Sequence, residues 1–389
     1  MTAVGPVFAS FRRAVLATAA VVVAFSTACA RHATLVPVPS AARADTIWYV
    51  SARARADGRD TRELTDTLEY GYVVYASERV NDALDGALDV ALIDSVRLTE
   101  PAFTAAIQPP ANDEQSPDDF TVLYVHGFGT SLHEGWQYAA EARIRSRASA
   151  RWVVFCWPSN GVGVTWPRIG ELFSRAYHED TEVALSSRPA FMHVAHMVID
   201  AIGATGVVLV SHSLGGRIVS DALTTEFGLA SILNGATLQT IAFVAPDVDA
   251  RHFGDSVVPA ARRLAQRVVL YTSGRDRVLS MSRQINGADR AGQPNATPLI
   301  RPGLETVDMT DGFVAEGWFQ GIFGTHHAIR RASAALFDLM HVVGAGFAPS
   351  CRTTLETATR TDAGVWRLTS TRPPDITARR QCERDLPAR

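Results

Sequence analysis

The stretch VLVSHSLGGRIV, Val208 to Val219, joins a run of apolar residues to the glycine-rich start of a predicted helix. Its centre, Ser-His-Ser-Leu-Gly, differs from the Gly-x-Ser-x-Gly nucleophile elbow in that Ser211 replaces the first glycine. The turn needs small flanking residues because the strand and helix backbones approach each other there, and Ser211 is small. Ser213 is therefore either a nucleophile held above a sheet or a hydroxyl that caps the helix.

Short apolar segments alternate with predicted helices on both sides of this stretch. They are TVLYV from Thr121, WVVFCW from Trp152, GVVLV from Gly206, LQTIAFVA from Leu238 and RVVLYTS from Arg267. Strands of this kind are typical of a parallel sheet covered on both faces. We therefore predict an α/β fold with a mostly parallel sheet and helices on both faces. Functional side chains in such folds gather beyond the carboxyl ends of the strands.

The composition is that of a globular chain, and it excludes several functions. The chain has 389 residues, of which 47% are hydrophobic and 20% charged, enough for a large core. A net charge of -3 leaves no excess of basic residues for phosphates, so we expect no nucleic-acid partner. All 37 basic residues are arginine, and the absence of lysine excludes a Walker A loop and a pyridoxal Schiff base. No CxxC or HExxH spacing is present, and we expect no metal ion or cofactor.

The N-terminus is typical of a secretory signal. Arg12 and Arg13 precede an apolar stretch over residues 14–25, and small residues follow. At about a dozen residues the apolar stretch is short of the roughly 20 needed to span a bilayer. We therefore expect residues 1–28 to be removed on export.

Two forms of signal cleavage are compatible with the residues that follow. Ser-Thr-Ala-Cys resembles a bacterial lipobox, which would place a lipid on Cys29, whereas Ala-Cys-Ala also permits ordinary cleavage after Ala30. We favour the lipoprotein, because a cysteine directly after the apolar region has a specific use there. The expected location is the bacterial cell envelope as a membrane-anchored lipoprotein, or the periplasm or exterior.

The remaining chain divides into a linker over residues 29–45, a main domain over 46–345 and a C-terminal extension over 346–389. Cys351 and Cys382 lie in this polar extension, and an oxidising compartment would let them pair. Their disulfide would stabilise the fold by about 3 to 4 kcal/mol on the chain-entropy model.

A second motif follows the strand TVLYV, upstream of the serine. The sequence VHGFG ends that strand with a His-Gly loop. Such a loop can offer backbone N–H groups to an oxyanion, and we expect Phe128 to donate together with Leu214, the residue after the serine. A His-Gly pair after a strand is common by chance, but its position upstream of an elbow favours the functional interpretation.

A nucleophilic serine needs a base and an acid that orients the base. Asp276 follows the strand RVVLYTS and is the expected acid, in the chain order serine, acid, histidine. Asp247 and Asp249, one strand earlier, are the alternatives.

The histidine candidates are His326 and His327, which lie after the last strand. Neighbouring side chains on a turn point in different directions, so only one of the two can reach Ser213. His212 is too close to the serine in the elbow, and His126 belongs to the oxyanion loop.

Together these residues resemble a largely uncharacterised bacterial family of α/β-hydrolases in the esterase/lipase superfamily, from about Thr46 to Val343. Its marks here are the strand ending at Arg53, Tyr70-Gly71, the VHGF loop, Cys156-Trp157-Pro158-Ser159, Tyr177, Asp180, the elbow, APDVD and the loop Ser273 to Arg277. The family elbow is typically AHSMGN, so a small residue other than glycine at Ser211 fits. Spacing from Phe337-Asp338-Leu339 places the family's base on His326, with His327 at the position of a serine.

The resemblance implies an α/β-hydrolase fold and a serine hydrolase. We expect an esterase- or lipase-like enzyme that attacks carboxylic esters with Ser213, uses His326 as base and Asp276 as orienting acid, and acts on a small-molecule or lipid ester. Membrane association would come from the lipidated N-terminus. A noncatalytic envelope binding or scaffold protein on the same fold, or an acyltransferase, are the alternatives.

Overall fold

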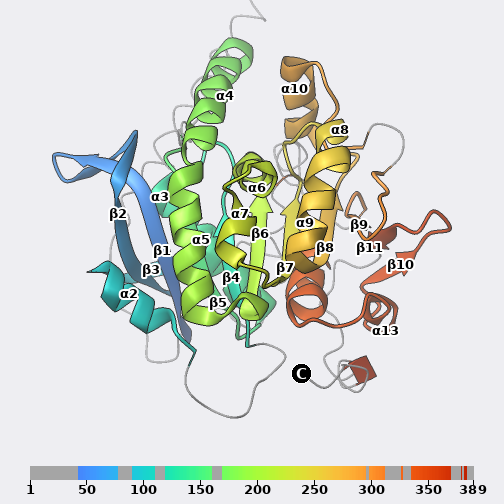
Figure 1. The fold of residues 1–389 in the computed structure, drawn as a ribbon, viewed down its shortest axis with the longest axis horizontal. Coiled ribbons are helices and arrows are strands. Elements are labelled where there is room, and N and C mark those ends of the chain that lie inside the picture. Colours follow the sequence, from blue (N-terminus) through green and yellow to red (C-terminus); the bar gives the residue numbers. More distant parts are fainter. Residues whose placement is uncertain are drawn as a thin grey trace, which may run out of the picture.

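The computed structural model describes residues 43–77, 90–109, 119–159, 169–294, 298–311, 326, 334–368, 378, 381 and 382. Within these residues the strands form one 11-stranded sheet in the order β10-β11-β9-β8-β7-β6-β4-β5-β1-β2-β3 (Figure 1). The expected signal sequence, Cys29 and His327 lie outside the described residues.

The centre of the sheet is parallel. Its strands are β4 (Thr121–Val125), β5 (Arg151–Cys156), β6 (Val207–His212), β7 (Leu238–Val244), β8 (Ala265–Thr272) and β9 (Glu305–Asp308). Because side chains alternate along a strand, Val122 and Tyr124 of β4 enter one core cluster whereas Leu123 and Val125 enter the other. Both faces of the sheet are thus buried, which confirms the predicted α/β architecture.

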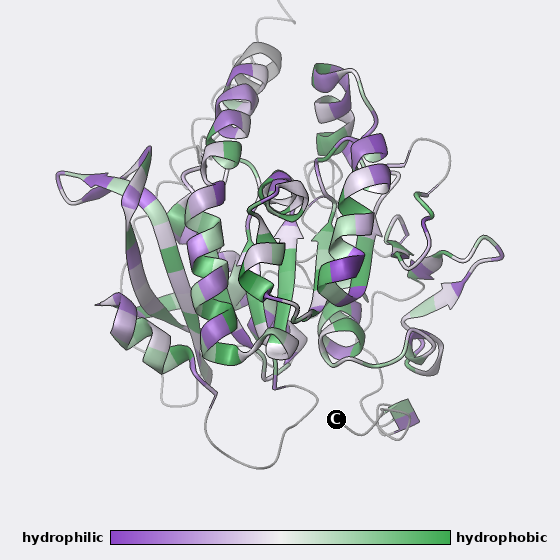
Figure 2. Ribbon diagram, viewed as in Figure 1, coloured by the Kyte–Doolittle hydropathy of each residue, from purple (hydrophilic) through white to green (hydrophobic). Residues whose placement is uncertain are grey.

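Helices cover the two faces. One face carries α2 (Glu100–Ile107), α5 (Arg188–Ile202), η1 (Ala204–Gly206), α6 (Gly215–Thr224), α7 (Leu229–Leu233), the π-helix η2 (Phe253–Val257) and α9 (Val258–Leu264). The other carries α3 (Leu132–Ser146), α12 (Ala334–Phe337) and the π-helix η3 (Asp338–Gly344). The central strands are largely hydrophobic, whereas the helices that face the viewer carry both hydrophilic and hydrophobic residues (Figure 2). The helices α4 (Ile169–Ser186), α8 (Ala250–His252) and α10 (Arg277–Asn286) lie toward the upper edge in Figure 1.

The N-terminal segment adds an antiparallel edge to this sheet. The strand β1 (Arg43–Ala56) pairs in parallel with β5 and antiparallel with β2 (Arg59–Ser77), which pairs with β3 (Val90–Leu98). Asp57 and Gly58 join β1 to β2 with φ of 51° and 76°. Positive φ at both positions of a two-residue turn matches the right-handed twist of a hairpin, and Asp-Gly is a favoured pair there.

The C-terminal segment forms the opposite edge. After α13 (Cys351–Thr354), the strands β10 (Ala358–Arg360) and β11 (Trp366–Leu368) pair with each other, and β11 pairs in parallel with β9. The main sheet therefore extends to Leu368, through part of the segment expected to form the C-terminal extension. Strands of three residues are too short to be recognised from an alternating pattern.

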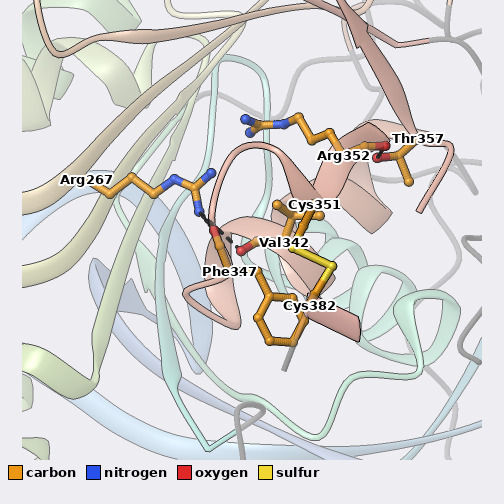
Figure 3. Close-up of a disulfide and its surroundings, with 7 residues drawn as sticks. All are labelled: Arg267, Val342, Phe347, Cys351, Arg352, Thr357 and Cys382. Carbon is orange, nitrogen blue, oxygen red and sulfur yellow. Dashed lines mark hydrogen bonds between the residues drawn. A yellow bond between two sulfur atoms is a disulfide. The ribbon is translucent and has the colours of Figure 1, made fainter. Parts of the chain in front are cut away.

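A disulfide and a buried arginine attach this segment to the domain. Cys351 and Cys382, the two cysteines expected to pair, form a disulfide, and the turn at Phe347 accepts a 2.7 Å hydrogen bond from Arg267 (Figure 3). The fully buried guanidinium of Arg352 makes two hydrogen bonds, of 2.7 and 2.9 Å, to the Asp338 carboxylate. A buried charge is tolerated only when it is paired in this way.

Candidate active site

Ser213 occupies a strained turn between β6 and α6. Its φ is 51°, in the left-handed region that a serine rarely adopts, and its side chain is buried. Backbone hydrogen bonds hold the turn, with Ser213 N donating to Val244 O at 3.0 Å and Asp247 N donating to Ser213 O at 3.0 Å. The N-cap of α6 is Leu214, with no side-chain capping bond. Ser213 therefore has the backbone geometry of a nucleophile elbow and does not cap the helix.

Two glycines allow the loop after β4 to approach this turn. A Cβ added to Gly127 would lie 2.9 Å from the Cβ of Ser213, and one added to Gly215 would lie 2.4 Å from the carbonyl oxygen of His126. Both distances are below van der Waals contact. The backbone of the expected oxyanion loop thus packs directly against the serine.

The structure brings His326 and Asp276 together. His326 Nδ1 lies 2.7 Å from Asp276 Oδ2, and both side chains are buried. The other carboxylate oxygen accepts a 2.9 Å hydrogen bond from Leu279 N at the start of α10, which fixes the orientation of the carboxylate. With Nδ1–H directed at a carboxylate, the basic lone pair of the imidazole is on Nε2.

His212 connects this pair to the elbow. Its Nε2 donates a 2.7 Å hydrogen bond to the carbonyl oxygen of His326, and the two imidazole centroids are 4.8 Å apart. A carbonyl oxygen only accepts, so Nε2 of His212 carries the proton. The candidate base is therefore anchored to the residue that precedes Ser213.

The other acid candidates have different partners. Asp247 accepts hydrogen bonds from Tyr177 at 2.6 Å and Ser282 at 2.5 Å, and Arg290 lies 3.5 Å from it. Asp249 caps α8 by accepting from His252 N at 2.8 Å. Neither carboxylate has His326 among these partners.

The expected oxyanion donors lie on the two segments that meet at Ser213. Leu214 is buried at the start of α6, where the helix directs its positive end toward the serine. Phe128 follows Gly127 in the loop after β4, and its ring packs against Tyr177 with centroids 6.0 Å apart. This arrangement is suited to stabilising negative charge that develops beside a nucleophile.

Several polar residues near the site had no role assigned from the sequence. They are Arg53, Ser159, Tyr177, Asp180, Arg217, Ser282 and Asn286, which form hydrogen bonds in two groups, one beneath the oxyanion loop and one around Asp247. Arg53, Ser159, Tyr177 and Asp180 belong to the motifs of the family resemblance, and that recurrence was the available signal.

A hollow in the described part of the protein lies apart from Ser213, Asp276 and His326, none of which lines it. In the described part of the chain no group of three or more His, Cys, Asp or Glu side chains is arranged to hold a metal ion. The hollow, of about 720 Å³, lies at α8 and α10, lined by Asp249, Arg251, Arg283, Asp289 and their neighbours. None of the helices described combines the length and apolarity of a transmembrane span.

The fold and the elbow define an α/β hydrolase. The chain belongs to the family described as "Alpha/beta hydrolase of unknown function (DUF900)", whose model matches residues 105–314. This confirms the resemblance inferred from the sequence. The matched range contains Phe128, Ser213 and Asp276 and ends before His326.

Solved structures of esterases are similar at low identity. "Structure of arylesterase" has 10% identity and a TM-score of 0.31, covering 81% of this chain and 90% of that one. Esterase B from Lactobacillus rhamnosis has 11% identity and a TM-score of 0.31, with 82% and 90% covered. A putative carboxylesterase from Lactobacillus plantarum has 10% identity and a TM-score of 0.27, with 63% and 82% covered. A search of curated proteins found no significant match.

Proposed function

We propose that this protein is a serine hydrolase that cleaves carboxylic esters through an acyl-enzyme. The observation that carries the proposal is the 2.7 Å contact between His326 Nδ1 and Asp276 Oδ2, beside a serine with a φ of 51°. A buried imidazole oriented by a carboxylate and tethered to a serine elbow is an arrangement for activating a hydroxyl.

In this proposal Ser213 Oγ attacks the acyl carbon while His326 Nε2 takes the hydroxyl proton. The N–H groups of Phe128 and Leu214 stabilise the negative oxygen of the tetrahedral intermediate. The bond from the acyl carbon to the alkoxy oxygen then breaks, and His326 returns the proton to the departing alcohol. Water repeats these steps on the acyl-serine, which releases the acid and restores Ser213.

A fluorophosphonate probe followed by ester hydrolysis tests the proposal. We expect the probe to label Ser213, and we expect Ser213→Ala to abolish labelling and hydrolysis of a short-chain aryl ester while the unfolding transition stays unchanged. Equal activity in the variant would refute the assignment. Lack of labelling in the unchanged protein would favour the noncatalytic alternative, and product analysis with added alcohols would distinguish hydrolysis from acyl transfer.

We also propose that the enzyme acts outside the cytoplasm on a small-molecule or lipid ester. The Cys351–Cys382 disulfide supports this, because structural disulfides persist mainly in oxidising compartments. A lipid on Cys29 would hold the enzyme at a membrane surface. Mass spectrometry of the mature N-terminus decides between an acylated Cys29 and an ordinary cleaved end after Ala30.

A further inference from the structure

The loop that joins β4 to α3 is held by side chains from β1, from α4 and from the segment after β5, and by one side chain of its own. These hydrogen bonds reach successive peptide groups between Gly127 and Ser131. Arg53, Ser159 and Asp180 are among the family motifs that the proposed mechanism does not use. Their shared location beneath one loop suggests a common task.

His126 orients the first of these peptides. Its ring is buried, stacks on Trp157 with centroids 5.2 Å apart, and places Nδ1 3.0 Å from the carbonyl oxygen of Gly127. Burial lowers the pKa of His126 to about 3, so the ring is neutral and Nδ1 carries its proton toward that carbonyl. In a trans peptide C=O and N–H point in opposite directions. The bond to Gly127 O therefore sets the direction of the Phe128 N–H.

Asp180 and Ser159 hold the next two peptides. Asp180 Oδ2 accepts from Gly129 N at 3.2 Å and from Ser159 Oγ at 2.5 Å. Ser159 Oγ in turn accepts from Thr130 N at 3.2 Å. Both side chains are essentially inaccessible to solvent. One carboxylate oxygen thus fixes two consecutive N–H groups, one directly and one through a hydroxyl.

Arg53 completes the arrangement from β1. Its Nη2 donates to the carbonyl oxygens of Thr130 at 2.7 Å and Ser159 at 2.8 Å. The guanidinium is buried, which lowers its pKa, and nearby acidic groups, Asp180 among them, offset only part of this effect. The positive charge near Asp180 compensates for a carboxylate that would otherwise be costly to bury.

We propose that Asp180 is a positioning residue that, through Ser159, holds the loop Gly127–Thr130 in the conformation that binds the oxyanion. The inference rests on the proposed function, since it assigns the Phe128 N–H to that oxyanion. Electrostatic stabilisation requires donors that are already in place when charge develops. Asp180 therefore acts on the rate of the chemical step and leaves substrate affinity almost unchanged.

Two replacements at Asp180 separate this role from simple stabilisation of the fold. The oxygen of Asn in Asp180→Asn can accept both hydrogen bonds that Oδ2 now accepts, whereas Asp180→Leu can accept neither. A displacement of about 1 Å at a catalytic group can cost on the order of 100-fold in rate. We expect kcat for an aryl ester to fall about 10- to 100-fold in Asp180→Leu and less than about 3-fold in Asp180→Asn, with KM within about 2-fold.

A matched control removes a buried carboxylate elsewhere. Asp45 pairs with Arg143 at 3.1 Å near the amino end of β1, whereas Arg53 lies near the other end of that strand. Asp45→Leu should lower the unfolding midpoint and leave kcat of the folded enzyme unchanged. If Asp180→Leu does not fold, Ser159→Ala decides, because it removes the bridge to Thr130 N and should lower kcat about 10-fold at constant KM.

Amide hydrogen exchange in the loop gives a readout that does not depend on activity. The amides of Gly129 and Thr130 should exchange faster in Asp180→Leu than in the unchanged protein and remain protected in Asp180→Asn. Unchanged kcat and unchanged loop exchange in a folded Asp180→Leu enzyme would overturn the inference. Absence of Ser213-dependent hydrolysis in the unchanged protein would instead overturn the proposed function, and the inference with it.

Discussion

Replacing Asp276 with Asn should move the imidazole proton of His326, the candidate base, from Nδ1 to Nε2. In the unchanged protein, one oxygen of Asp276 accepts a 2.9 Å hydrogen bond from Leu279 N, and the other lies 2.7 Å from His326 Nδ1. In the variant, the Asn oxygen can keep the bond to Leu279 N, which places the NH2 group against His326 Nδ1. Because an NH2 group only donates, Nδ1 must then accept, and the imidazole proton moves to Nε2. A histidine in that tautomer cannot take the proton of Ser213.

The expected loss in kcat is about 10⁴-fold, the size seen when the acid of a serine triad is replaced by its amide. At 1.36 kcal/mol for each factor of ten, this corresponds to about 5 kcal/mol in the activation free energy. Stability should change little, since Asn and Asp are similar N-cap residues. KM should stay near its original value because the acid does not contact the substrate.

The assay is steady-state hydrolysis of a short-chain aryl ester, together with urea unfolding of each variant. Asp249→Asn is the matched control, since Asp249 also follows a strand and also caps a helix, and its variant should retain full kcat. Retention of kcat within about 10-fold in Asp276→Asn would refute the assignment of the His326–Asp276 pair as the base and its orienting acid.

Three further variants test other features of the structure. Burial lowers the pKa of His126 from 6.5 to about 3, so between these pH values the unfolded chain binds more protons than the folded one. The free energy of unfolding should therefore fall as the pH drops through this window, by up to about 4 to 5 kcal/mol. Urea unfolding at a series of pH values should show this slope, and a slope unchanged in His126→Gln would contradict it. Replacing Cys351 and Cys382 with Ala should lower the free energy of unfolding by about 3 to 4 kcal/mol for a separation of 31 residues, and an equal midpoint with and without reductant would be contrary evidence. The buried hydroxyl of Ser211 has no hydrogen-bond partner within the described residues, so Ser211→Ala should raise stability by about 1 kcal/mol, and a lower melting temperature would argue against this.

The central architecture could be predicted from the sequence because its strands are buried on both faces. A continuous apolar run such as that of β4 or β6 indicates a covered strand without knowledge of its neighbours. The turn at Ser213 could also be predicted, since a strand end, small residues and a helix start lie within a few positions. These are local properties of the chain.

The parts that were missed depend on contacts between distant segments. Asp247 and Asp276 both follow strands, and only the three-dimensional arrangement shows that the Asp247 carboxylate accepts hydrogen bonds from Tyr177 and Ser282. Likewise, no sequence pattern shows that Asp180 reaches the loop at Gly129, 51 residues away. Side-chain partners of this kind are set by tertiary packing, which a single sequence does not encode locally.

The sheet order has a consequence for dissecting this protein. Among the described residues, β1 is the first strand and pairs with β5, whereas β11 is the last and pairs with β9. These two segments therefore cover opposite edges of the part of the sheet that the family model matches. A fragment limited to residues 105–314 would leave β5 and β9 with rows of unsatisfied backbone donors and acceptors, a surface prone to intermolecular strand pairing. It would also lack His326. Expression trials should therefore retain both flanking segments.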